Sequence, residues 1–533
     1  MNKINKISVL LFCLLFTSIS AFAASEAEYK KVGKTYKLNS DGSQEYRYAM
    51  ELTLYTHTAM NGTYGESFIL YNPQYQELQI HSSYTVQKDG SIVETPPNAF
   101  VEVLPRFAAD APAYNNLKEM VVVHTGLELG ATIYLDYSII SKPGFYPALD
   151  IEELLSATSP VKEYSLTIIV PHNTTLTYHL YDSSAKAIET SSNGQKTVNW
   201  TLHNVPASSR EAFLPENNDG TPRLIATTYT SQSEALGYMK QCFNNSMNYE
   251  SKAFAQYITE NATNDKEKIE ITQRHVVENI DLCPIPLDYT GFTIRNADDV
   301  LRSAYGTATE KTQLLCSMLN AAGIKSEIVA FYPANIDANI AGIRSIKKFM
   351  VKATSNSEDL YLSAFNMEPI NVKARGILDN IFTLDGKQIQ VNTQPLIIKE
   401  NKEINIDASM AKGGFIIYTL PVLLKGIDTW NISSLPSKRT GLFEIPSLLQ
   451  EEITYAINNA EGLTLKTPVG QTVVSKPYGK VTQTITSKDS TIEVIRTIEL
   501  NKQQFTPAEY SDLRVLLNEW TDPNNRLLLF SEK

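Results

Sequence analysis

Histidine and cysteine are scarce in this 533-residue sequence, which contains seven histidines and four cysteines. The closest histidines, His172 and His179, are seven residues apart, and no two cysteines are spaced Cys-x-x-Cys. Zinc sites need closely spaced ligands of these types, and calcium loops need an acidic repeat that is also missing. Phosphate-binding and dinucleotide-binding glycine motifs are absent as well. The sequence therefore predicts no metal and no cofactor.

An excess of basic residues is also missing. Lys and Arg together number 47 and Asp and Glu number 58, which gives a formal charge of −11. Proteins that bind nucleic acids present a basic surface to the phosphate backbone. We therefore expect no nucleic-acid partner.

Long apolar runs are limited to the N-terminus. Lys3 and Lys6 precede an apolar run from residue 7 to 19, and Ala21-Phe22-Ala23 supplies a small-x-small cleavage pattern. A largely apolar run of thirteen residues is too short for a membrane-spanning helix, which needs about twenty. This pattern predicts a signal peptide over residues 1–23 and export to the periplasm or the cell exterior. No later run is long enough to predict a transmembrane segment in the mature chain.

Three cysteines remain after the predicted cleavage, at positions 242, 283 and 316. An odd number permits one disulfide at most. The alternative is that all three are unpaired core thiols.

The hydrophobic pattern divides the mature chain into three parts. Residues 24–228 alternate apolar and polar side chains with a period of two, as in Tyr46 to Leu54, and turn residues separate the runs. Such short strands predict an antiparallel β-sandwich. Residues 229–400 begin with helical periodicity, strongest from Thr309 to Ala322, and continue with short strands, which predicts an α+β domain.

Residues 401–533 return to the β pattern. Ile492 to Leu500 alternates apolar and acidic side chains in a clear strand. Thr506-Pro507-Ala508-Glu509 has the form of a capping box with proline at the first helical position, which predicts a helix from there to about Trp520.

The order of these parts and several motifs resemble a bacterial exported architecture. That architecture has a β-sandwich domain of unknown function, a papain-like or transglutaminase-like α+β core and a C-terminal β-rich domain. The residues that carry the resemblance are Asp89-Gly90, the segment 126–130, Pro222-Arg223-Leu224, the segments 296–301, 305–306, 310–315 and 321–324, and the segments 496–500 and 505–510. The resemblance implies an α+β multidomain protein.

In the transglutaminase-like family the core helix begins Gly-Asp-Cys-x-Asp-Lys, and its cysteine joins a histidine and an aspartate in a triad. A thiol at a helix N-terminus is activated because the helix dipole favours the thiolate. Matching the motif residue by residue places Gly306, Thr307, Glu310 and Lys311 on the family pattern and puts Ala308 at the nucleophile. The resemblance places the family's histidine near Lys348 and its aspartate at Ser363.

The distribution of histidine supports this interpretation independently. The last histidine of the chain is His275, so none follows Ala308 in the family's order. We therefore expect a core without a catalytic triad, which would serve in binding or scaffolding.

Two alternatives remain open. A cysteine protease or amidase could use Cys316 as nucleophile and His275 as base, although Cys316 lies about 12 Å along the helix from Ala308. A purely structural component of the cell envelope is the second alternative. Partners of the favoured interpretation are a peptide, a protein or a glycan of the envelope. An aromatic group formed by Tyr64, Phe68, Tyr71 and Tyr75 could stack on sugars or peptides, or pack at the edge of the sandwich.

Overall fold

The computed structural model describes residues 25–215, 220–367, 372–375, 378–432, 435–459, 462–488 and 491–532. The predicted signal peptide lies outside these residues. None of the helices within the described ranges is long and apolar enough to cross a membrane. The chain forms two compact units. Unit 1 comprises residues up to 147, 155–174 and 184–208, and unit 2 comprises residues 148–154, 175–183 and 209 onward.

Unit 1 contains an eight-stranded sheet in the order β12-β13-β10-β1-β2-β8-β4-β5. Its strands alternate buried and exposed side chains, so that Val32, Met50 and Leu52 point into the core. The sheet was expected to be antiparallel throughout, but β1 and β10 pair in parallel, with Val32 opposite Tyr164. The strands are β1 (Ala27–Leu38), β2 (Gln44–Leu54), β4 (Gln76–Val86), β5 (Ile92–Glu94), β8 (Thr132–Ser141), β10 (Val161–Pro171), β12 (Ile188–Ser192) and β13 (Gln195–Val205).

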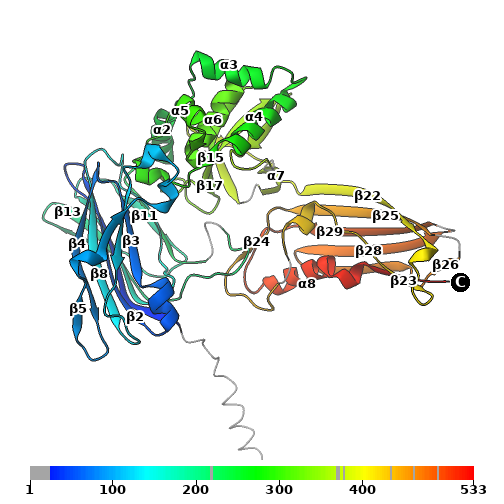
Figure 1. The fold of residues 1–533 in the computed structure, drawn as a ribbon, viewed down its shortest axis with the longest axis horizontal. Coiled ribbons are helices and arrows are strands. Elements are labelled where there is room, and N and C mark those ends of the chain that lie inside the picture. The colour runs from blue at the N-terminus through cyan, green and yellow to red at the C-terminus, as the bar shows by residue number, and fades with distance from the viewer. Residues whose placement is uncertain are drawn as a thin grey trace, which may run out of the picture. The chain divides into compact units, whose positions relative to one another are not determined.

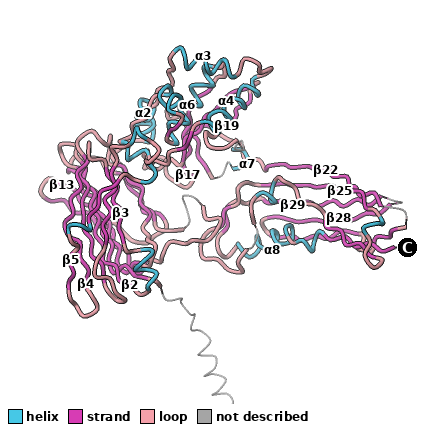
Figure 2. The backbone as a smooth tube through the Cα atoms, viewed as in Figure 1, coloured by secondary structure: helices cyan, strands magenta, loops and turns pink. Residues whose placement is uncertain are grey.

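A second, three-stranded sheet of unit 1 has the order β3-β7-β6, so β3 is an edge strand. Its strands are β3 (Glu66–Tyr71), β6 (Phe100–Val103) and β7 (Lys118–Val123). Figure 2 labels β2, β4, β5 and β13 of the larger sheet and β3 of the smaller one, all drawn as strands.

Unit 2 begins with a three-stranded sheet that the sequence pattern did not distinguish from the sandwich. Its order is β11-β14-β9, with β9 (Asp150–Leu154), β11 (Thr177–Tyr181) and β14 (Arg223–Thr227). All five residues of the central strand β14 are buried, including Arg223.

The α+β core of unit 2 places helices around a five-stranded sheet of order β19-β18-β17-β20-β21 (Figure 1). The helices are α2 (Gln232–Cys242), α3 (Tyr249–Ile258), α4 (Asp265–Asn279), α5 (Ala297–Ser303), α6 (Ala308–Ala321) and α7 (Val372–Arg375). The strands of this sheet are β17 (Ser326–Pro333), β18 (Lys348–Ser355), β19 (Glu358–Leu362), β20 (Asp379–Thr383) and β21 (Gln388–Ile389). A separate two-stranded sheet consists of β15 (Asp281–Leu282) and β16 (Tyr305–Gly306). Helix α6 contacts α3, α4, α5, β17 and β18 and is the centre of the core. Sequence reasoning located α6 within one residue and missed α3.

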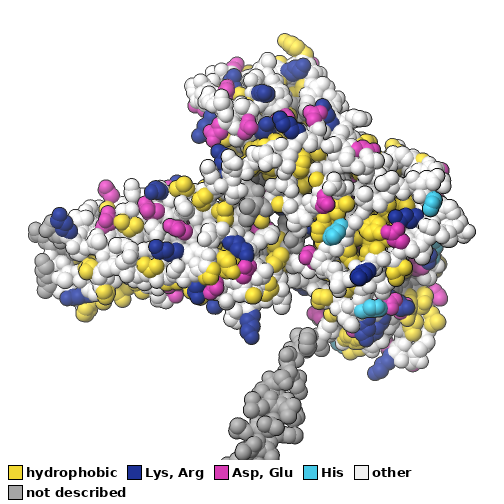
Figure 3. Space-filling view, turned by 180° about the vertical axis from the view of Figure 1, so that it is seen from behind, with side chains coloured by type: hydrophobic (Ala, Val, Ile, Leu, Met, Phe, Trp, Pro, Cys, Tyr) yellow, Lys and Arg dark blue, Asp and Glu magenta, His cyan; other side chains and the backbone are white. Residues whose placement is uncertain are grey.

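The C-terminal part of unit 2 is β-rich, with one sheet of order β22-β25-β29-β28-β27, another of order β23-β31-β26 and a short β24-β30 pair. The strands are β22 (Leu396–Ile406), β23 (Phe415–Thr419), β24 (Phe443–Glu444), β25 (Leu449–Asn459), β26 (Leu463–Leu465), β27 (Gly470–Lys476), β28 (Gly479–Lys488), β29 (Thr491–Leu500), β30 (Gln504–Phe505) and β31 (Leu527–Glu532). Basic and acidic side chains are interspersed over the surface of these strands that Figure 3 shows.

The terminal helix α8 (Tyr510–Thr521) begins three residues later than the sequence predicts. The capping-box contacts nevertheless form, because Thr506 N–H donates to Glu509 Oε2 at 2.9 Å and Glu509 N–H donates to Thr506 Oγ1 at 3.4 Å. The box therefore closes a turn ahead of the helix. The fold class is confirmed as α+β and multidomain.

Candidate functional site

The N-terminus of α6 is built as the sequence motif requires. Thr307 is the N-cap residue, and its Oγ1 accepts a hydrogen bond from Glu310 N–H at 3.3 Å. Glu310 Oε2 in turn accepts from Thr307 N–H at 2.9 Å, which completes a capping box. The first turn of α6 is thereby held in place.

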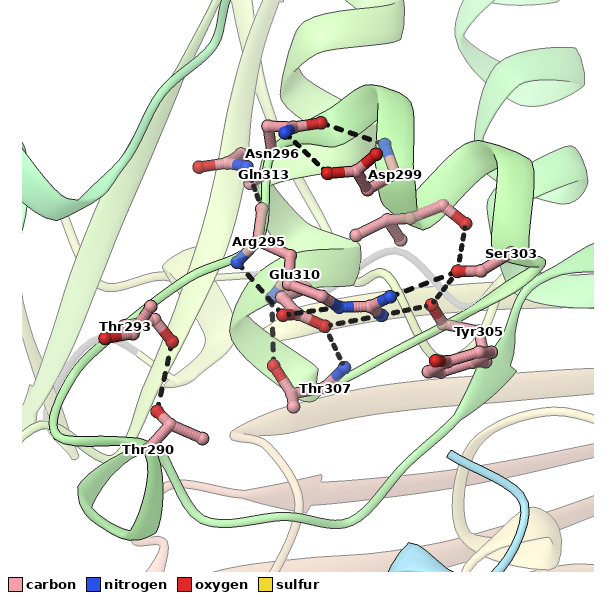
Figure 4. A network of polar contacts seen from close by, with 11 residues as sticks. Thr290, Thr293, Arg295, Asn296, Asp299, Ser303, Tyr305, Thr307, Glu310 and Gln313 are labelled. Carbon is pink, nitrogen blue, oxygen red and sulfur yellow. Dashed lines mark hydrogen bonds and ion pairs between the residues drawn. The ribbon is translucent and has the colours of Figure 1, made fainter. Parts of the chain in front are cut away.

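Glu310 is also the centre of a buried ion pair, drawn in Figure 4. Its carboxylate is fully buried and accepts three hydrogen bonds from Arg295: from the backbone N–H at 3.0 Å, from Nε at 3.1 Å and from Nη2 at 3.0 Å. The Arg295 guanidinium lies over the Tyr305 ring, 4.5 Å from its centroid. A buried carboxylate is stable only with such compensation. The network joins the loop before α5 to the start of α6.

Gly306 and Lys311 fit the same close packing. A Cβ at Gly306 would stand 2.9 Å from Val300 Cγ1 and 3.3 Å from the Glu310 side chain, so only glycine fits. The buried Lys311 ammonium donates to the backbone carbonyl of Ile280, and burial lowers the pKa of this ammonium. The residues matched to the family motif thus support the helix and one another.

Ala308 is the exception in this helix. Every side chain from Thr309 to Leu319 is buried, whereas Ala308, at the first helical position, is exposed. It faces a cavity of about 820 Å³. The position that the family pattern assigns to the nucleophile therefore opens to a space large enough for a ligand.

The cavity is lined by apolar side chains and by charges of both signs. The lining residues are Glu152, Leu154, Pro286, Leu287, Asp288, Phe292, Ala308, Thr309, Thr312, Ile343, Arg344, Ile346, Lys347, Lys348, Phe349 and Phe365. Two of the cations are engaged by carboxylates, since Arg344 Nη1 lies 2.9 Å from Asp288 Oδ2 and Lys347 Nζ lies 3.0 Å from Asp379 Oδ1.

The structure brings two of the three predicted triad positions to this cavity. Lys348 begins β18 and lines the cavity together with Ala308. Ser363 directly follows β19 and is buried, with its Oγ accepting from Phe365 N–H at 3.1 Å. It does not line the cavity, although its neighbour Phe365 does.

Cys316 and His275 lie elsewhere. The Cys316 side chain is fully buried, and burial raises the pKa of its thiol to about 11. Its sulfur contacts Ser326 Oγ at 3.7 Å. The His275 ring packs against Phe254, 5.1 Å between centroids, and burial lowers the pKa of its imidazole. Neither residue lines the cavity.

No disulfide joins the described cysteines. Within the described ranges, no group of three His, Cys, Asp or Glu side chains is arranged to hold a metal ion.

Sequence reasoning missed one wall of the cavity, which strand β9 supplies through Glu152 and Leu154. Glu152 Oε1 lies 3.2 Å from Nη1 of Arg223, the arginine of the Pro-Arg-Leu motif, which is 2% exposed. Burial, which outweighs the attraction of Arg223, raises the pKa of the Glu152 carboxyl to about 7. The available signal was the pair of acids at alternate positions, Asp150 and Glu152, in a strand whose partner strand begins with arginine.

Asp150, two residues earlier on β9, is buried beside Glu152. Its Oδ2 accepts from Arg344 N–H at 2.9 Å, while Oδ1 has no hydrogen-bond partner among the described residues. Burial raises the pKa of the Asp150 carboxyl. A Cβ at Gly342 would stand 1.9 Å from Asp150 Oδ1, so the chain passes this carboxylate too closely for any side chain. Two acids thus share one poorly solvated environment at the cavity wall.

We expect the stability of the β9–β14 region to fall as pH rises from about 4.5 to about 7. The folded state raises the pKa of Glu152, so it binds more protons than the unfolded chain within this window, and stability is lost as the proton leaves. Glu152→Gln should remove about 1–3 kcal/mol of this pH dependence. Hydrogen exchange of β9 and β14 amides at a series of pH values measures it. Glu153→Gln, on the opposite face of the strand, is the control, and equal slopes in both variants would contradict the assignment.

Comparisons with known proteins agree with the three-part architecture. The sequence profile of the domain of unknown function DUF3857 matches residues 40–209, that of the transglutaminase-like superfamily matches residues 252–356, and that of DUF3858 matches residues 415–530. No curated protein matches the chain.

Among solved structures, a protein from Parabacteroides distasonis ATCC 8503 named a "putative protease" is 59% identical, with a TM-score of 0.85. The alignment covers 95% of this chain and 99% of that one. An M1 zinc metallopeptidase from Deinococcus radiodurans matches at 13% identity over 37% of this chain and 41% of its own. Its TM-score of 0.20 is too low to indicate a shared fold. The chain therefore belongs to the same family as the Parabacteroides protein, with a transglutaminase-like core between a DUF3857 and a DUF3858 domain.

Proposed function

We propose that this protein is an exported, non-catalytic member of its family that binds a peptide segment in the core cavity. The observation that carries the proposal is the exposed methyl group of Ala308 at the wall of the 820 Å³ cavity, on a helix whose N-terminus is held by a capping box and a buried ion pair. A methyl group can neither attack a carbonyl nor accept a proton.

The surroundings of Ala308 support binding without chemistry. An acyl-transfer site needs a base within hydrogen-bond reach of its nucleophile. None of the residues that line the cavity is a histidine or a cysteine. The Parabacteroides relative is named a "putative protease", so loss of activity in this chain is a proposal about this chain alone.

The chemistry of the lining favours a peptide. Apolar side chains such as Phe292, Ile346 and Phe349 can receive the side chains of an extended peptide. Charges of both signs, represented by Arg344 and Glu152, can orient its polar backbone and ends. The predicted signal peptide places this binding in the periplasm or outside the cell, among the proteins of the envelope.

Cys316 is a poor candidate for the alternative enzyme. A catalytic thiol must be exposed to substrate and partly ionised near neutral pH. The Cys316 thiol is fully buried and its pKa is raised to about 11. If the purified protein nevertheless cleaved peptides and lost this activity on Cys316→Ala, the proposal would be wrong.

We expect Ala308→Trp to weaken peptide binding at least about tenfold, which corresponds to 1.4 kcal/mol, because the indole would fill space that the ligand needs. Isothermal titration calorimetry with a library of random peptides, followed by the tightest binders individually, measures the effect. Soluble glycan fragments are titrated in parallel. Ala109→Trp, at an exposed alanine of unit 1, is the matched control. Equal affinities of the two variants would overturn the assignment of the cavity.

A further inference from the structure

Unit 1 contains a second pocket that the proposed function does not use. It has a volume of about 290 Å³ and lies between the edge strand β3 and strands β1, β2 and β8. Its inner wall includes Tyr29, Tyr48 and Tyr137, and Tyr48 and Tyr137 pack with their rings 5.6 Å apart. The pocket is thus an aromatic cavity at the open edge of a sheet.

Polar groups gather on the β3 side of this pocket. Glu66 and Ser67 of β3 and Thr63 just before it line the pocket, as does Thr158 from another part of unit 1. Three of these four side chains, all except Ser67, are exposed. The pocket therefore combines an aromatic interior with a polar mouth.

Phe68 stands at this mouth with 59% of its surface exposed, which is unusual for a phenylalanine. Tyr64 supports the neighbouring wall, because its hydroxyl lies 2.7 Å from both Thr158 Oγ1 and Ser159 Oγ. Tyr71 and Tyr75 do not line the pocket, and Tyr75 stacks on Phe145 at 5.3 Å instead. The structure thus divides the predicted aromatic group into two members that border the pocket and two that pack elsewhere.

Ser67 is oriented by a buried histidine. Its Oγ lies 2.8 Å from Nε2 of His124, which is 5% exposed and whose Nδ1 has no partner among the described residues. A buried N–H without an acceptor is costly, so the neutral tautomer that avoids this cost carries its proton on Nε2 and donates to Ser67. Burial also lowers the pKa of His124 to about 4, which keeps the ring neutral. Ser67 therefore accepts from His124, and its own O–H can donate to a further acceptor.

We propose that this pocket binds a saccharide, with one pyranose ring packed on the tyrosines of the inner wall and bordered by Phe68 at the edge of β3. A pyranose has an apolar face of C–H groups that packs on aromatic rings, and a rim of hydroxyls. The Ser67 O–H can donate to one of these hydroxyls, and the Glu66 carboxylate can accept from others. The volume of the pocket suits one sugar ring, and this proposal is independent of the peptide cavity in unit 2.

The same geometry argues against a serine hydrolase. A nucleophilic serine needs a histidine that accepts its proton, and this histidine needs an acid on its other nitrogen. Here His124 Nε2 donates to Ser67 instead of accepting from it, and Nδ1 of His124 has no acid beside it among the described residues. The contact between Ser67 and His124 therefore orients the Ser67 hydroxyl and does not activate it as a nucleophile.

The test is saturation-transfer difference NMR of the full mature chain with a panel of monosaccharides and short oligosaccharides, followed by titration of those that bind. We expect Phe68→Ala to weaken binding by about tenfold or more, since stacking on an aromatic ring is lost. Ser67→Ala should weaken it by a smaller factor. Tyr249→Ala removes an aromatic ring that is 86% exposed on α3 and is the matched control, expected to leave binding unchanged.

Three results would overturn the proposal. One is the absence of a signal for every saccharide of the panel. Another is saccharide binding that Phe68→Ala and Ser67→Ala leave intact. The third is competition by an unrelated linear peptide at the same residues, which would make this edge of β3 a peptide site.

Discussion

Glu310→Gln should cost about 3–5 kcal/mol of stability in the α+β core, the range measured when one partner of a buried ion pair is removed. Glu310 is fully buried and accepts four hydrogen bonds, three from Arg295 and one from Thr307. In glutamine an NH2 group replaces one carboxylate oxygen. Its two N–H donors would then face the N–H donors of Arg295 and Thr307 that this oxygen accepted from. It also leaves the Arg295 guanidinium, 16% exposed, without its countercharge.

The measurement needs a probe inside the core, because the three tryptophans, at positions 200, 430 and 520, all lie outside residues 229–400. Hydrogen exchange of α6 amides, followed by mass spectrometry, reports on the core directly.

Glu267→Gln is a matched control on helix α4. Glu267 occupies the same third helical position, and its carboxylate accepts from Thr263 N–H at 2.7 Å, but it is exposed and has no arginine beside it. We expect this change to cost less than about 1 kcal/mol, as for other surface capping contacts. Similar costs for Glu267→Gln and Glu310→Gln would show that the ion pair with Arg295 contributes little.

Ala308→Cys should create a thiol that reacts with iodoacetamide on the order of a hundredfold faster than Cys316. A thiol at a helix N-terminus has a pKa of about 3.5–7.5. The pKa of Cys316 is about 11. The difference gives at pH 7 a thousandfold or larger excess of thiolate, which the lower nucleophilicity of the more acidic thiol partly offsets. Exposure of position 308 to the cavity acts in the same direction.

Peptide mapping of the alkylated protein separates the introduced thiol from the native thiols at positions 242, 283 and 316. Labelling as slow as that of Cys316 would show that position 308 is closed to solvent or that the helix N-terminus does not activate it. We expect no peptide hydrolysis from Ala308→Cys alone, because the cavity lining contains no imidazole to act as base. Hydrolysis by this single variant would mean that another group of the cavity serves as base.

The parts of the fold that the sequence predicted well are those in which local and long-range preferences agree. Helix α6 combines an N-cap threonine, a glutamate three residues later and an apolar run. Three separate sequence signals therefore indicate where it begins. Helix α3 has an N-cap in Asn248 but exposes Tyr249 and Tyr257 on its surface, which breaks the apolar periodicity. Hydrophobic periodicity therefore did not predict α3.

The candidate site was predictable only where one short segment builds it. Ala308 was located because a six-residue motif surrounds it. Glu152 lies more than 150 residues earlier in the chain, and its burial depends on Arg223, another 71 residues away from it. Hydrophobic periodicity holds no information on such pairings, since an acid in a strand is ordinarily on the solvent side.

The parallel pairing of β1 with β10 illustrates the same limit. Each strand has the alternation expected of a sandwich, and alternation alone does not tell which neighbour a strand takes or in which direction. Alternation therefore predicts that this region forms strands, whereas the order and direction of the strands in the sheet came only from the structure.

The division of the chain into two units has consequences for how the protein folds during synthesis and for where it can be truncated. Between residues 147 and 209 the chain crosses five times from one unit to the other. A ribosome must therefore release β14 before β9 and β11, which alternate along the chain with strands of unit 1, can form their three-stranded sheet. A gene cut at residue 228 would separate Glu152 and Arg223 from the cavity that Glu152 lines. The two N-terminal parts of this family must therefore be inherited together.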